Sequence, residues 1–322
     1  MRNMKKIVTI LSTCMLSLFS FTFVYGQDIA AAIETYNAGA TALASNNYVA
    51  AIESFNKAIK MFEAISELDE DGASAFKQCK EILPQIHLRY GKELAVNKNF
   101  DNALAQLDKA IETAKKYNNP DVEKEANELI PQLVMAGADD NLNLGLFNEA
   151  IAGYNKMLTY TPNDPDVYLR LGIAQSKLNN EDAAIAAYLK AIELGDKQDA
   201  PKMLSNIYLK KAAAAFSDKN NSEALAMAKK ANQYYETVQG NQIIGLSAMQ
   251  LKKYDDAIPA LEAYIAQSND SKNKNAIIYN IAAAYEAKGN IAKACGYYKQ
   301  IVSDPKYKAA VEYKINTVLK CK

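Results

Sequence analysis

Apolar positions along this chain follow a helical pattern that recurs seven times. In each repeat an Ala follows a short turn, and an apolar residue or Cys stands directly after it. Further apolar residues lie four, seven and eight positions beyond the Ala, which places them on one face of a helix. We call these seven residues the anchor alanines, and they lie 33 to 52 residues apart: Ala51, Ala103, Ala150, Ala184, Ala224, Ala257 and Ala294. A period in this range is typical of stacked helix pairs, so the pattern predicts an all-α repeat protein.

Short turns divide each repeat into two predicted helices. Asn or Gly stands just before the second helix in six repeats, as in Asn46-Asn47 and Gly289-Asn290. These residues tolerate the left-handed backbone conformation that ends a helix, and Asn can also cap the next helix. The sixth turn, at 251–254, contains neither residue. The sequence therefore predicts a helical hairpin in each repeat, with the sixth turn as the least typical.

The fourth repeat is similar to the tetratricopeptide repeat (TPR) family. Residues of this repeat fill the large–Leu–Gly and Ala–aromatic–Ala positions of the family motif: Tyr168, Leu171, Gly172, Ala184, Tyr188 and Ala191. Gly39, Gly91 and Gly245 occupy the position of Gly172 in three other repeats. The resemblance covers about residues 30–308. It implies a right-handed superhelical solenoid of about seven TPR helical hairpins, which we place at 27–303.

Two inserts and the C-terminal segment depart from the regular repeat. The inserts lie near 66–83 and 118–130, and similar phrases containing Pro84 and Pro131 follow them. We expect the inserts to form extra helical turns that kink into the next helix, with each Pro in a first turn. Residues 304–322 place apolar side chains at intervals of four. This spacing predicts a C-terminal capping helix that covers the open end of the stack.

The first 26 residues have the features of a secretory signal peptide. Three basic residues precede an apolar stretch at 7–24, and a small residue, Gly26, precedes Gln27. We expect cleavage after Gly26 and export to the periplasm, either free or associated with the outer membrane. An uncleaved anchor and lipidation at Cys14 are the alternatives. Hydroxyl side chains in the stretch disfavour the anchor, and the apolar run beyond Cys14 disfavours lipidation.

Charge and cysteine content narrow the classes of partner and fold. Without residues 1–26 the chain has 34 Lys and Arg against 37 Asp and Glu, a net charge of −3. This charge argues against nucleic acid, and no polybasic cluster indicates a membrane surface. Cys79, Cys295 and Cys321 are too few for a disulfide framework. Cys295 takes a buried apolar position, and Cys321 is the expected free thiol. A Cys295–Cys321 bridge is the alternative, but the sequence cannot supply the Cα separation that it requires.

The sequence contains no recognisable catalytic or metal-binding constellation. The single His, His87, falls at a packing position of the second repeat. No Cys pair has zinc spacing, and no Gly-rich phosphate loop occurs. The acidic run at 67–71 lacks the ligand spacing of a calcium loop. We therefore expect a non-enzymatic protein without cofactors or bound metal.

The resemblance to the TPR family implies binding on a concave face that is formed by the first helix of each hairpin. In this family, residues fifteen, eleven and eight positions before the anchor face that groove. The predicted groove contains nine apolar residues: Leu88, Met135, Leu169, Ile173, Leu209, Phe216, Leu246, Met249 and Tyr279. Such a surface suits a helical or extended apolar segment of a protein. Alternatively, these residues pack against neighbouring hairpins, because an error of one residue in phase would bury them.

These features favour a protein–protein interaction scaffold of the bacterial cell envelope, with a protein or peptide in an apolar groove. The alternative is a glycan or small-ligand binding module of an envelope uptake system, since the chain contains 20 Tyr residues and aromatic rings stack on sugars. Many of these tyrosines fall at packing positions. An apolar groove is also compatible with self-association.

Overall fold

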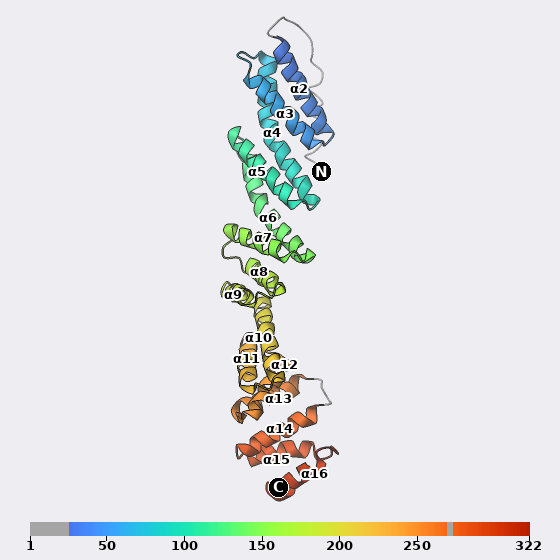
Figure 1. The fold of residues 1–322 in the computed structure, drawn as a ribbon, viewed down its shortest axis with the longest axis vertical. Coiled ribbons are helices and arrows are strands. Elements are labelled where there is room, and N and C mark those ends of the chain that lie inside the picture. Colours follow the sequence, from blue (N-terminus) through green and yellow to red (C-terminus); the bar gives the residue numbers. More distant parts are fainter. Residues whose placement is uncertain (1–25, 269–272) are drawn as a thin grey trace. The chain divides into compact units, whose positions relative to one another are not determined.

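The computed structural model describes residues 26–268 and 273–322 of the chain. These residues form fifteen α-helices, α2 to α16, and one π-helix, η2, and they contain no β-strand (Figure 1). The chain divides into two compact units, of which unit 1 ends at Tyr160 and unit 2 begins at Thr161. The predicted signal peptide, 1–26, lies outside the described residues except for Gly26. In the described part of the chain, no helix has the length and apolar character of a membrane span.

Unit 1 consists of three helical hairpins. Its helices are α2 (Gly26–Ala44), α3 (Tyr48–Glu63), α4 (Glu70–Val96), α5 (Phe100–Lys116), α6 (Pro120–Leu144) and α7 (Phe147–Tyr160). Each helix packs on the next one along the chain, and the first helices also contact each other, α2 with α4 and α4 with α6. Phe55, Phe62 and Leu83 belong to an apolar core between α2, α3 and α4.

Residues of both inserts are helical and extend the first helix of their hairpins. Asp69 caps α4 by accepting a hydrogen bond from the Gly72 N–H at 2.7 Å, and Asn119 caps α6. The resulting helices are 27 and 25 residues long. Pro84 and Pro131 therefore lie inside α4 and α6 and not in a first turn, because the helix already begins within the insert.

Unit 2 consists of four hairpins and a C-terminal helical segment. Its hairpins are α8 (Pro165–Lys177) with α9 (Glu181–Glu193), α10 (Asp199–Ser217) with α11 (Asn221–Tyr234), α12 (Val238–Gln250) with α13 (Tyr254–Gln267), and α14 (Lys274–Ala287) with α15 (Ile291–Gln300). The C-terminal segment contains α16 (Lys308–Tyr313) and η2 (Lys314–Val318). Two apolar clusters form the core, one around Tyr188 and Leu204 and the other around Leu261 and Tyr298.

Each anchor alanine is the fourth residue of the second helix of its hairpin. All seven have no exposed surface. The residue five positions before each anchor has a left-handed backbone, with φ between 56° and 78°: Asn46, Lys98, Gly145, Asn179, Lys219, Lys252 and Gly289. Every hairpin therefore turns with the same geometry, in which one left-handed residue ends the first helix.

Glycines on the first helices allow the two helices of a hairpin to approach each other closely. A Cβ atom added at Gly172 would lie 2.6 Å from Tyr188 Cε1, and one added at Gly245 would lie 2.2 Å from Leu261 Cδ2. Tyr188 and Leu261 are the residues four positions after their anchors, and both are at most 2% exposed. The helices of these hairpins thus meet where a large side chain lies on a glycine.

The C-terminal segment is held against the last hairpin by several contacts. Val311 is fully buried, and Lys314 Nζ forms an ion pair with Glu286 at 2.6 Å. Cys295 and Cys321 form a disulfide, with their Cα atoms 5.7 Å apart. Cys321 is therefore not the free thiol that the sequence suggested, because the fold brings residues 26 positions apart within bonding distance. Cys79 is the free, buried cysteine of the described chain.

Candidate binding surfaces

The nine predicted groove residues all lie on first helices of hairpins. Leu88 on α4 and Met135 on α6 belong to unit 1, and the other seven lie on α8, α10, α12 and α14 of unit 2. Leu88 and Leu209 are buried, with 5% and 9% of their surfaces exposed, while the others are half-buried. The binding role of these positions stays a prediction.

In unit 2 the fold brings the predicted residues onto two neighbouring clusters. Six half-buried side chains, which we call the apolar stripe, pack partly on these clusters: Leu169, Ile173, Phe216, Leu246, Met249 and Tyr279. Met249 contacts both clusters and so connects the two parts of the stripe. Leu209 belongs to the core beneath it. Side chains anchored in this way present a fixed apolar surface, because half of each is already packed.

The last position of the stripe also contacts the C-terminal segment. The Tyr279 ring stacks on Tyr307, with the ring centroids 5.6 Å apart, and meets the edge of Tyr298 at 5.5 Å. On the same helix, Glu286 accepts a hydrogen bond from the Tyr298 hydroxyl at 2.8 Å and pairs with Lys314. Burial raises the pKa of Tyr298, and the hydrogen bond to Glu286 raises it further. The C-terminal segment thus covers part of the stripe at Tyr279.

The corresponding face of unit 1 is more polar. Lys92 on α4 pairs with Glu125 on α6 at 2.5 Å. The Tyr154 hydroxyl donates a hydrogen bond to Asp139 at 2.7 Å. Both Lys92 and Asp139 occupy the position eleven residues before an anchor, where the stripe of unit 2 carries Ile173 and Leu246. This face of unit 1 therefore carries charged side chains at two positions where unit 2 carries large apolar ones.

The titratable residues that stand out in unit 1 are packed inside it. His87 is 6% exposed, and its Nδ1 lies 2.8 Å from Gln106 Oε1. Burial lowers the pKa of His87 and raises that of the Cys79 thiol to about 12, so at neutral pH the imidazole is uncharged and the thiol is protonated. The described residues contain no cluster of three or more His, Cys, Asp or Glu that could hold a metal ion.

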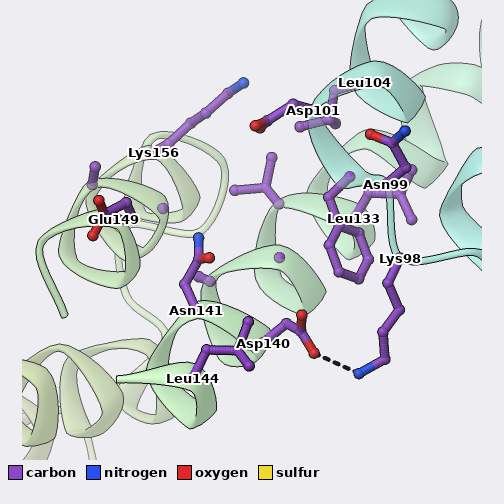
Figure 2. A pocket seen from close by; sticks show the side chains of 16 residues that line it. Lys98, Asn99, Asp101, Leu104, Leu133, Asp140, Asn141, Leu144, Glu149 and Lys156 are labelled. Atoms are coloured by element: carbon purple, nitrogen blue, oxygen red, sulfur yellow. Dashed lines mark hydrogen bonds and ion pairs between the residues drawn. The ribbon is translucent and has the colours of Figure 1, made fainter. Parts of the chain in front are cut away.

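A cavity that the sequence analysis missed opens between α5, α6 and α7 of unit 1 (Figure 2). Its volume is about 540 Å³. Mostly apolar and small residues line its walls: Phe100, Leu104, Leu133, Val134, Gly137, Ala138, Leu144, Ala152 and Gly153. Five charged residues and two asparagines complete the lining: Lys98, Asp101, Asp140, Glu149, Lys156, Asn99 and Asn141. The Lys98–Asp140 ion pair, at 2.5 Å, closes one side, and Leu144 at the rim is 68% exposed.

Two residues of α6 that line this cavity are smaller than those of the fourth and last repeats. Val134 and Gly137 stand sixteen and thirteen positions before their anchor. The fourth repeat carries Tyr168 and Leu171 at these positions, and the last repeat carries Ile278 and Ile281. A Cβ atom added at Gly137 would also lie 3.2 Å from Phe100 Cβ. The repeat alignment shows the glycine where the family motif has Leu, but it does not show the distances between helices that leave the cavity.

Comparison with known proteins identifies the repeats. Residues 165–195 match one family model described as tetratricopeptide repeat, and residues 244–308 match another. No curated protein matches the sequence.

Several solved structures are similar to this chain. MamA is 24% identical, with a TM-score of 0.33, and the match covers 57% of this chain and 96% of MamA. YrrB, described as a TPR protein with an unusual peptide-binding site, is 19% identical, with a TM-score of 0.34 and coverage of 59% and 94%. A thermophilic TPR protein of Thermus thermophilus is 18% identical, with a TM-score of 0.25 and coverage of 74% and 99%.

The two repeat matches agree with the architecture of the chain. The matched segments contain α8 with α9 and the helices from α12 to α15, which are hairpins of the kind described above. Their anchors Ala184, Ala257 and Ala294 have no exposed surface, as the repeat motif requires. This chain therefore contains tetratricopeptide repeats, at residues 165–195 and 244–308.

Proposed function

We propose that this chain is a non-enzymatic scaffold that holds an apolar segment of a partner protein against the apolar stripe of unit 2. Tetratricopeptide repeat proteins generally serve as scaffolds for protein–protein interactions, and this chain contains their repeats. The observation that carries the proposal is the set of half-buried apolar side chains along α8, α10, α12 and α14. A helix or extended segment gains free energy by covering such side chains, since their exposed halves then leave water.

The proposed location is the periplasm, after cleavage of the signal peptide. The composition of residues 1–26 supports export. The Cys295–Cys321 disulfide supports it as well, because structural disulfides persist in oxidising compartments. N-terminal sequencing of the protein isolated from its native cells is the direct test. A chain that begins at Gln27 would support export, and an intact Met1 on cytosolic protein would contradict it.

Site-specific photocrosslinking in the native cell tests the binding surface. A photoreactive amino acid is placed at Ile173 or Met249 in the stripe, and at Leu189 on α9 as the control. Leu189 is apolar and 40% exposed but lies on a second helix. We expect the two stripe positions to yield the same protein adduct and the control to yield none. Adducts from all three positions, or from the control alone, would contradict the proposal.

A further inference from the structure

The two units carry net charges of opposite sign. Residues 26–160 contain 12 Lys and Arg against 20 Asp and Glu, a net charge of −8. Residues 161–322 contain 22 Lys and Arg against 17 Asp and Glu, a net charge of +5. Charge that is separated in this way attracts the acidic unit of one molecule to the basic unit of another, most strongly at low ionic strength.

The positive charge of unit 2 extends into the C-terminal segment, which also exposes apolar side chains. Residues 305–322 contain five Lys and one Glu. Tyr313 at the end of α16 is 60% exposed, and Val318 in η2 is 45% exposed. The terminal helix of a repeat array normally has a polar outer face, which keeps the array soluble and ends the stack. The exposed Tyr313 and Val318 depart from that pattern and offer apolar side chains within a positively charged segment.

The cavity of unit 1 has the complementary properties. Its apolar walls enclose about 540 Å³, a volume large enough for one aromatic side chain. Its lining carries three carboxylates against two ammonium groups, and one of the ammonium groups, Lys98, is already paired with Asp140. Asn141 adds an amide to the lining, and Figure 2 shows it beside Asp140 and Leu144. Leu144 adds exposed apolar surface at the rim.

We propose that this chain associates with itself head to tail, with Tyr313 of one molecule inserted into the unit 1 cavity of a second molecule. The lysines of segment 305–322 then lie near Asp101 and Glu149 of the receiving molecule, and Leu144 covers the inserted side chain. This contact is heterologous, so each dimer retains one free cavity and one free C-terminal segment, which allows rings or longer chains. It does not use the apolar stripe, so this proposal and the proposed function can fail independently.

Sedimentation velocity of the protein without residues 1–26, over a range of concentrations, tests the association. Leu144→Lys places a positive charge at the cavity, and Tyr313→Glu removes the aromatic ring and places a negative charge on the segment. We expect each change to weaken association roughly tenfold or more, since each removes a central apolar contact and opposes the charge of its partner surface. Val49→Lys is the matched control, because Val49 is a 60% exposed apolar residue of unit 1 outside the cavity.

Mixing the two variants distinguishes this geometry from other modes of association. The Leu144→Lys molecule retains an intact C-terminal segment, and the Tyr313→Glu molecule retains an intact cavity. An equimolar mixture should therefore form dimers that neither variant forms alone, and high salt should dissociate them. A monomeric wild type at all concentrations would overturn the proposal, as would equal weakening by Val49→Lys or a mixture that stays monomeric.

Discussion

At the scale of single residues, the left-handed position before each anchor is the most regular feature of the chain. Asn or Gly at this position was recognisable in the sequence because these residues tolerate positive φ at little cost. Three repeats carry a lysine there instead: Lys98, Lys219 and Lys252. Asn stands beside Lys98 and Lys219 but not beside Lys252, so only the sixth turn looked atypical in the sequence. Lys252 nevertheless has a φ of 57°, close to the values in the other repeats. Tertiary packing imposes the conformation even where the local residue disfavours it.

Relief of this local cost should be measurable at Lys219, which is exposed and has φ of 61°. Lys219→Gly is expected to raise the free energy of unfolding by up to about 1 kcal/mol, because Gly has no Cβ to clash in the left-handed region. Urea denaturation measures the change. Lys219→Ala retains the Cβ and should show no such gain. A glycine variant less stable than the alanine variant would contradict this explanation.

Two glycines inside helices should respond to Ala in opposite directions. At Gly296 in α15, nothing lies within 4 Å of an added Cβ, so Gly296→Ala should stabilise by about 1 kcal/mol through helix propensity. At Gly172 the added Cβ would lie 2.6 Å from Tyr188, so the ring must move, and Gly172→Ala should destabilise by about 1–3 kcal/mol. Thermal unfolding of both variants checks the signs. Equal shifts would show that the hairpin contact at Gly172 is looser than the structure indicates.

Burial of His87 predicts a pH dependence of stability. Since burial lowers its pKa below the usual value of 6.5, the unfolded chain binds a proton more readily than the folded chain. Stability should therefore fall as the pH drops through about 6.5. Comparison of the wild type with His87→Gln at each pH isolates this contribution, because Gln does not titrate. The unfolding free energy of the wild type relative to that of the variant should decrease on acidification. A constant difference would show that His87 does not take up a proton on unfolding.

At the scale of helices, the sequence predicted what depends on local periodicity. The hairpins follow from apolar spacing and from turn residues, both of which act within about ten residues. The predicted position of Pro84 in a first turn was wrong, because a proline motif alone does not show whether the preceding insert is already helical. The cavity beside Gly137 and the bond between Cys295 and Cys321 were not predicted. Both depend on distances between helices, which periodicity does not contain.

The disulfide should determine how firmly the C-terminal segment is held. It closes a loop with a sequence separation of 26, and loss of such a bridge removes about 3 kcal/mol. We expect Cys321→Ser to increase hydrogen exchange in α16, η2 and α15, while the helices of unit 1 are unaffected. A dithiol reductant should produce the same pattern of exchange in the wild type. It should cause no further change of exchange in the Cys321→Ser variant. Unchanged exchange after reduction would show that Val311 and the Lys314–Glu286 pair suffice.

At the scale of the whole molecule, the contacts of each helix are mainly with its neighbours in the chain. Within each unit, helices pack on the next one along and, in several cases, on the next but one, as α10 does on α12. A protein of this kind behaves nearly as a one-dimensional array, in which stability is a sum over repeats and their interfaces. Damage to one repeat should therefore spread to its neighbours and diminish with distance along the chain. A globular domain with one core would instead lose stability everywhere at once.

Ala184→Glu tests this locality. Ala184 has no exposed surface and lies in the cluster that extends from α8 to α13. A carboxylate there has no partner, so the local free energy of opening should fall by several kcal/mol. Hydrogen exchange should show the largest loss of protection in α8 to α11 and little change in α2 and α3. Ala186→Glu, at an exposed position two residues along the same helix, is the control and should leave exchange unchanged. A loss spread evenly over every helix would mean that the chain unfolds as a single cooperative unit, and the repeat would then describe its architecture but not its stability.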